Sequence, residues 1–191
     1  MEVTARLSWA LDCSVSGNYV GNSMIEELTC SASLAYHNHS LLGSMSSLIL
    51  RNVDLSPVPA KQMTSLATSV TTLIHIENIS GCDLHLVNLL SSVNCKELVI
   101  SRQSLGKEET RALVQAMESG VESVELKTGS TFDKESLAAY SGQGKCGAVA
   151  FWWDRYSTQD AETWATLRHS YWLYNPMDCG SRTFIKMNRY R

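Results

Sequence analysis

The sequence predicts an α/β fold in which short parallel strands and helices alternate and stack into a short curved solenoid. Three observations predict it. The apolar pattern of one strand-helix unit recurs along the chain, the recurrence has a steady period, and each unit joins a short strand pattern to a longer helical one. One such unit cannot bury its apolar face alone, so neighbouring units must stack. The parallel strands should line the concave face and the helices the convex face.

The clearest unit spans residues 95–120. Its first half carries apolar residues at Cys95, Leu98, Ile100 and Leu105. This fits the pattern L-x-x-L-x-L-x-x-N/C-x-L, except that Gln103 stands at the polar position. Its second half, residues 107–117, has apolar side chains three and four positions apart between Gly106 and Gly120. That spacing predicts a helix with one buried side.

The same frame recurs before and after this unit. Its first apolar position falls at Met45, Val70, Cys95, Val121 and Cys146. The next two inward positions read Leu48, Leu73, Leu98, Val124 and Val149, then Leu50, His75, Ile100, Leu126 and Phe151. His75 is the one polar residue among these ten, and we interpret it as a hydrogen-bonded core histidine. Asn78 matches the polar position of the pattern, so we expect its amide to satisfy backbone groups of the turn.

The expected elements follow in order. Strands are predicted at 48–53, 73–76, 124–126 and 148–154, besides the one that opens the unit 95–120. Helices are predicted at 61–70, 84–93, 107–117, 134–140 and 161–171. Pro57 and Pro59 break the first strand and suit a helix start. Gly142 and Gly144 close the fourth helix.

The two ends of the chain differ from the middle. Residues 45–171 form the solenoid, with about five units. We interpret residues 1–44 as a degenerate repeat or cap, because terminal repeats must cover an open apolar end, or as part of a truncated fragment. Residues 172–191 predict a capping hairpin and a basic tail, with a turn at 175–180 and a second strand at 183–187.

A repeat of about 25 residues with a helix on its outer side resembles the ribonuclease-inhibitor-like class of leucine-rich repeats. The resemblance covers residues 45–175. Similar repeats form the C-terminal sensing arms of NACHT-type intracellular receptors. The resemblance implies a leucine-rich repeat solenoid with atypical caps and a receptor-like, innate-immune context. The sequence carries no Walker motif, so it implies nothing about ATP-driven activation.

Composition excludes several classes of function. Net charge is −3, which argues against a nucleic-acid surface spread over the molecule. No run reaches the roughly 18 apolar residues of a membrane span, and the apolar stretch near the N-terminus, residues 7–11, is too short for a signal peptide. We therefore expect a cytoplasmic protein without nucleic-acid or membrane partners. The six cysteines form no CxxC pair, and Cys95 and Cys146 fit a buried apolar position.

No motif points to catalysis. His37 and His39 are the one close histidine pair, without two further ligands at zinc spacing. The stretch 141–145, SGQGK, fails the phosphate-loop pattern at both ends. A nucleophile, a base and an orienting group cannot be assembled from spacing. The sequence predicts a non-enzymatic protein that uses no cofactor and no metal.

The candidate binding residues come from strand alternation, since residues between the inward positions must face the concave surface. Two of the expected concave rows are Ile49, Ile74, Val99, Glu125 and Ala150, and Arg51, Ile76, Ser101, Lys127 and Trp152. Trp and Arg are enriched in binding hot spots. The predicted partner-binding residues are Arg51, Arg102, Glu125, Lys127, Trp152 and Trp153. The alternative for the tryptophans is that one of them packs under the C-terminal cap.

These patterns favour a protein-protein interaction module that binds a protein partner through its concave strands. Two alternatives remain open at the level of the sequence: a regulator that occludes an enzyme active site, and a structural fragment without a function of its own. An occluding inhibitor of that kind would need a strongly charged concave face, whereas the predicted rows are mixed.

Overall fold

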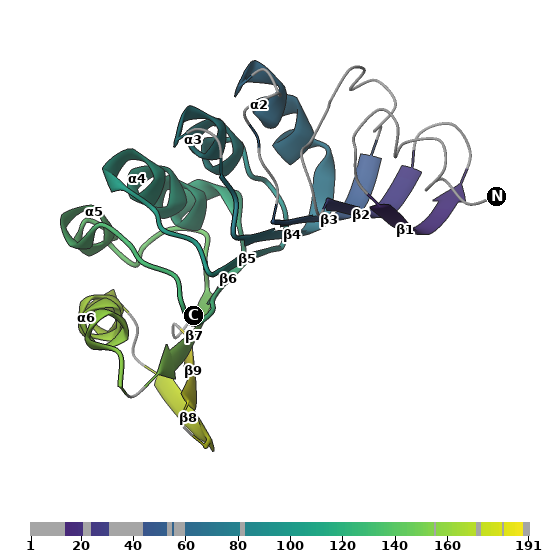
Figure 1. Ribbon diagram of the computed structural model, residues 1–191. Helices are drawn as coiled ribbons and strands as arrows, with labels where there is room; N and C mark the ends of the chain where they lie inside the picture. Colours follow the sequence, from purple (N-terminus) through teal and green to yellow (C-terminus); the bar gives the residue numbers. More distant parts are fainter. Residues whose placement is uncertain are drawn as a thin grey trace.

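The computed structural model describes residues 14–20, 24–30, 44–52, 55, 60–80, 83–154, 156–170, 173–180 and 182–188. Within these residues the chain forms one open sheet, and the helices all lie on one side of it (Figure 1). The sheet bends into an arc whose outer side carries the helices and whose inner side is bare. The predicted α/β class, with a mostly parallel sheet and alternating helices, is confirmed.

The described part of the sheet has nine strands in the order β1-β2-β3-β4-β5-β6-β7-β9-β8. They are β1 (Ser14–Val20), β2 (Met24–Cys30), β3 (Ser44–Arg51), β4 (Val70–Glu77), β5 (Glu97–Ser101), β6 (Ser123–Leu126), β7 (Ala148–Asp154), β8 (Leu173–Cys179) and β9 (Arg182–Asn188). The strands from β2 to β7 are parallel neighbours. Antiparallel strands flank them, β1 at one end and the β9-β8 hairpin at the other.

Helices connect the parallel strands from β3 onward. They are α2 (Ala60–Thr68), α3 (Asp83–Ser91), α4 (Lys107–Gln115), α5 (Lys134–Ala138) and α6 (Thr158–Leu167). Two of them have caps that the sequence encodes: Asp133 accepts a hydrogen bond from the backbone N–H of Ser136, and Ser157 accepts one from that of Asp160. Each helix carries the chain back along the sheet, so that the next strand starts at the same end as the previous one and pairs with it in parallel.

The core lies between the sheet and the helices. Alternate residues of each strand enter it, such as Leu48 and Leu50 from β3, both fully buried. Leu89 of α3 and Leu113 of α4 close it from the outer side. One continuous apolar cluster therefore runs through the described units.

In β4 the residues that face the core lie one position later than the repeat pattern predicts. Ile74 and Ile76 lie beside Leu48 and Leu50 and are buried in the core, whereas the prediction placed both isoleucines on the concave face. His75 was predicted to point inward, but its pairing with Ile49 puts it on the concave side. A shift of one residue exchanges the two faces of a strand, and a constant spacing of 25 residues missed the longer step here.

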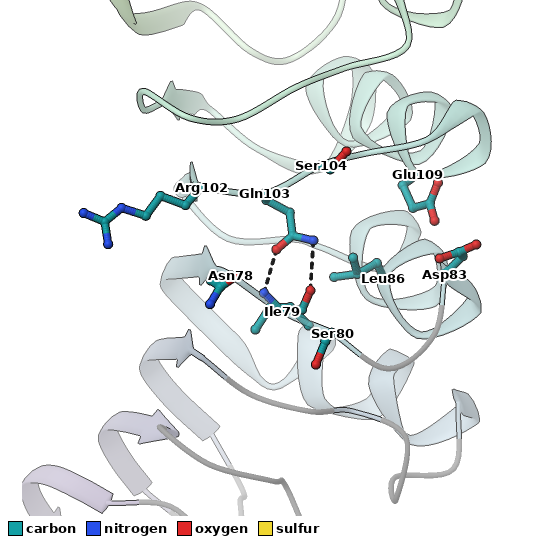
Figure 2. Close-up of a pocket in the computed structure, with 9 residues that line it drawn as sticks. All are labelled: Asn78, Ile79, Ser80, Asp83, Leu86, Arg102, Gln103, Ser104 and Glu109. Carbon is teal, nitrogen blue, oxygen red and sulfur yellow. Dashed lines mark hydrogen bonds between the residues drawn. The ribbon is translucent and has the colours of Figure 1, made fainter.

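The inward amide of the turns also differs from the prediction. Asn78 is exposed and donates its amide hydrogen to Asn52 Oδ1 at 2.7 Å. Gln103 is the buried amide: it accepts from the backbone N–H of Ile79 at 2.7 Å and donates to its carbonyl at 3.2 Å (Figure 2). Gln103 therefore bonds both backbone groups of a residue in the preceding turn.

The glycine-rich stretch 141–145 serves packing. A Cβ on Gly144 would lie 2.2 Å from Glu118 Cα, so only glycine fits against that backbone. The next residue, Lys145, donates its backbone N–H to the Glu118 carbonyl and its Nζ to the Gly120 carbonyl at 3.0 Å. Gly144 and Lys145 thus hold this turn against residues 118–120 of the preceding unit.

The two ends of the chain can be described in part. β1 and β2 fall within residues 1–44, and the remainder of that predicted cap lies outside the described residues. At the other end β8 and β9 form a hairpin, but β8 runs through Asn175 and Pro176, which were predicted to be in the turn. The turn comes at Gly180, where φ is +73°. The tail beyond residue 188 is outside the described part.

No helix of the described residues combines the length and the apolar character needed to cross a bilayer.

Candidate binding site on the concave face

A hollow of about 320 Å³ opens on the inner side of the sheet. Four of the predicted binding residues line it: Arg51, Arg102, Lys127 and Trp152. His75, Glu77 and Arg182 also line it. The side chains come from β3, β4, β5, β7 and β9 and from the turns after β5 and β6. Residues distant in sequence meet there because the strands lie side by side. We call this space the concave hollow.

Glu77 anchors one side of the concave hollow. Its carboxylate accepts a hydrogen bond from Arg51 Nε at 2.6 Å, and Arg102 Nη1 lies 3.7 Å from its other oxygen. The Glu77 side chain is only 14% exposed, whereas that of Arg102 is 74% exposed. Arg51 is thus held against the sheet. The guanidinium of Arg102 extends into solvent and donates no hydrogen bond to any residue that the structure describes.

Glu125 anchors the opposite side. Its Oε1 accepts a hydrogen bond from Trp152 Nε1 at 2.6 Å, which fixes the plane of the indole. Trp152 also packs against Phe184 of β9 with ring centroids 4.9 Å apart. Lys127 Nζ lies 3.9 Å from the same carboxylate, too far for a hydrogen bond. The indole of Trp152 is therefore held in one orientation at the wall of the hollow. The ammonium group of Lys127 beside it donates no hydrogen bond to a described residue.

Trp153, the sixth predicted residue, lies away from the concave hollow. The next residue of a strand points to the opposite face, and Trp153 packs against the core and stacks on Trp164 of α6 with centroids 6.5 Å apart. Of the tryptophan pair, Trp152 lies at the hollow and contacts Phe184 of the C-terminal hairpin, whereas Trp153 packs on the core and on α6. The other five residues gather within the hollow or at its wall.

His75 lies in the floor of the concave hollow. Its Nε2 is buried and has no hydrogen-bond partner among the described residues, and Glu77 Oε2 is 3.9 Å away. Burial, followed by the positive charge of Lys127, lowers the pKa of His75 below its usual 6.5. The lowered pKa favours the neutral form of the imidazole at neutral pH.

The balance of charge in the hollow differs from that of the chain. Among its described lining residues, four are cationic and one, Glu77, is a carboxylate, and Glu125 is a second carboxylate at its wall. The chain as a whole has a net charge of −3. Arg182 comes from the C-terminal hairpin, which pairs β9 with β7. Lys186 follows it on the same face of β9, opposite Ala150. The hairpin thus adds positive charge to the concave face.

Five lining residues were not among the predicted binding residues: His75, Glu77, Ser101, Thr128 and Arg182. His75 and Glu77 were assigned wrongly or passed over because the frame slipped in β4, and a histidine at a core position was the available warning. Arg182 belongs to the segment predicted as a cap, and nothing in the local pattern indicates that β9 pairs with β7.

A second hollow of about 290 Å³ lies near the start of α3 and α4. Asp83 and Glu109 both face it, and Arg102 extends in the opposite direction (Figure 2). Glu109 is buried at the third position of α4, with its carboxylate packed against Gly106 at the helix N-terminus. An anionic group is favoured at that end of a helix, so the carboxylate has a structural role there.

The described residues offer no metal site, since no three His, Cys, Asp or Glu side chains among them gather to hold an ion. Burial raises the pKa of the Cys95 thiol to about 11, which makes it a poor nucleophile. Cys146 is equally buried in the core. Both cysteines pack as apolar side chains.

No family model matches the chain, and no curated protein or solved structure matches it either. The chemistry of the concave hollow is therefore the basis for inferring what the protein does.

Proposed function

We propose that the protein is a non-enzymatic interaction module, a short leucine-rich repeat solenoid that binds a protein partner through the concave hollow. The observation that carries the proposal is the gathering of Arg51, Arg102, Glu125, Lys127 and Trp152 in one place on a bare strand face. Indole and guanidinium groups in a hollow are the side chains that dominate protein interfaces.

The repeat interpretation has support in the turns. Gln103 makes the backbone bonds that the pattern assigns to an inward amide, and Asn52, Asn78 and Arg102 each follow a parallel strand with φ near +50°. Equivalent turns after consecutive strands are what a solenoid built of repeated units requires. The sensing-arm context of NACHT-type receptors belongs to this proposal as an expectation from the resemblance.

A photocrosslinking experiment tests the proposed function. A benzoylphenylalanine side chain placed at Thr128, in the concave hollow, should form adducts with a specific protein in an extract of the source cells. The same probe at Glu135, exposed on the outer helix α5, is the matched control and should give none of these adducts. Adducts from Glu135 alone, or identical adducts from both positions, would contradict a concave binding face.

A further inference from the structure

The hydrogen-bonding capacity of the concave hollow is unbalanced. Both carboxylates already accept short hydrogen bonds, Glu77 from Arg51 and Glu125 from Trp152. The guanidinium of Arg102 and the ammonium of Lys127 make no hydrogen bond among the described residues, since their nearest carboxylate oxygens are 3.7 and 3.9 Å away. The hollow therefore presents free donors and few free acceptors.

The hairpin adds further donors on the same face. Arg182 lines the hollow and is exposed, and Lys186 is exposed two positions beyond Phe184. Neither forms an ion pair within the described residues. Cations held in one hollow repel one another, and a bound anion removes that repulsion while it uses their donors.

The backbone at Arg102 points to a role for its side chain. Its φ is +48°, and the residues that follow the preceding two strands in the same conformation, Asn52 and Asn78, are both asparagines. The left-handed region suits asparagine and costs an arginine about 1 kcal/mol. The chain thus places a long cation at a position where the backbone favours a short amide, and that cation reaches solvent beside the hollow.

Size and shape select among anions. A hollow of about 320 Å³ has room for one or two side chains, and the indole of Trp152 offers a fixed apolar wall beside the cations. The cations are spread from β3 to β9 across the sheet. A row of separate carboxylates along an extended peptide matches that spread.

We propose that the concave hollow recognises an acidic peptide segment of its protein partner, whose carboxylates engage Arg102, Lys127 and Arg182 while an adjacent side chain packs on Trp152. This inference rests on the proposed function and names the chemistry of the partner. The contacts are charge-assisted and partly exposed, so binding depends on salt.

Fluorescence anisotropy with a labelled octaglutamate peptide tests the proposal. Octaglutamate should bind the full chain at low salt, and binding should weaken several-fold when the salt is raised from 50 to 200 mM. Octaglutamine and octalysine of the same length should show no binding. An eight-nucleotide oligothymidylate and a phosphoserine peptide are further probes, because the same N–H groups can donate hydrogen bonds to phosphate oxygens.

A pair of matched variants separates the hollow from net charge. The triple variant Arg102→Gln, Lys127→Gln and Arg182→Gln should bind octaglutamate roughly tenfold more weakly. The control triple variant Lys61→Gln, Lys107→Gln and Lys134→Gln makes the same change in charge on exposed residues of the outer helices. It should bind like the unaltered chain, and circular dichroism should show that both variants stay folded.

Three outcomes would overturn the proposal: no binding of octaglutamate, equal losses in the two triple variants, or binding of the nucleic acid or phosphoserine probe without octaglutamate. The crosslinking experiment keeps this separate from the proposed function. If Thr128 crosslinks a partner while octaglutamate does not bind, the concave face is a binding site for a different chemistry. If Thr128 crosslinks nothing, the proposed function itself fails.

Discussion

The buried amide of Gln103 gives a sharp test of how the units hold together. In Gln103→Leu the side chain keeps a similar volume, but the backbone N–H and carbonyl of Ile79 lose their partners at 2.7 and 3.2 Å. Both residues are buried, so water does not readily replace the bonds. Each buried backbone group left unsatisfied costs about 1–3 kcal/mol, which sets the expected loss at about 2–4 kcal/mol after the gain from burying leucine.

Thermal unfolding followed by circular dichroism measures this loss. For a chain of this size about 2–4 °C is lost per kcal/mol, so the midpoint should fall by roughly 4–16 °C. Gln115→Leu makes the same chemical change on an exposed residue at the end of α4 and should leave the midpoint nearly unchanged. A fall in Gln103→Leu no larger than that of the control would refute the role assigned to the amide.

Three further predictions concern packing, pH and thiol reactivity. Gly144→Ala should lower the unfolding free energy by about 1–3 kcal/mol in urea titrations, whereas Gly147→Ala, whose Cβ would meet nothing within 4 Å, should cost far less. The pKa of His75 is lower in the folded chain than in the unfolded one, so the unfolded chain takes up that proton first as pH falls. Stability should therefore drop on acidification from pH 7.5 through about 6.5, and His75→Gln should show a smaller drop in matched urea titrations. A thiol reagent at pH 8 should modify the exposed Cys179 and spare Cys95 until urea unfolds the chain, as peptide mapping would show; early modification of Cys95 would contradict its burial.

The alternation of strand and helix could be predicted from the sequence because apolar residues repeat with the period of each element. Which residues of β4 face the core was not predicted correctly from the sequence. On one alternating set Leu73 is the only apolar residue, beside Thr71, His75 and Glu77, whereas the other set carries Val70, Ile74 and Ile76. The constant repeat spacing selected the Leu73 set, although the local pattern favours the other. The buried set is decided by pairing with β3, in which Met45 pairs with Val70 but Ser47 pairs with Leu73, so β4 gains one residue within the strand pair.

Five of the six candidate residues meet at the concave hollow because parallel strands bring equivalent positions together. Trp153 lies away from the hollow because it follows Trp152 directly in β7 and so points to the helices. Arg182 could not be predicted, since its place depends on the antiparallel pairing of β9 with β7. Asn52, Asn78 and Arg102 share a positive φ after consecutive strands, and Arg102 is the one of the three that is not an asparagine.

The most direct test of the concave hollow as a binding site is a paired measurement on Arg102→Asn. Asparagine suits the left-handed backbone at this position, so the unfolding free energy should stay level or rise by up to about 1 kcal/mol. Binding of octaglutamate should weaken several-fold in the same preparation, because the exposed guanidinium is gone. Unchanged binding in this folded variant would contradict the account, and a loss of stability would show that Arg102 has a structural role instead.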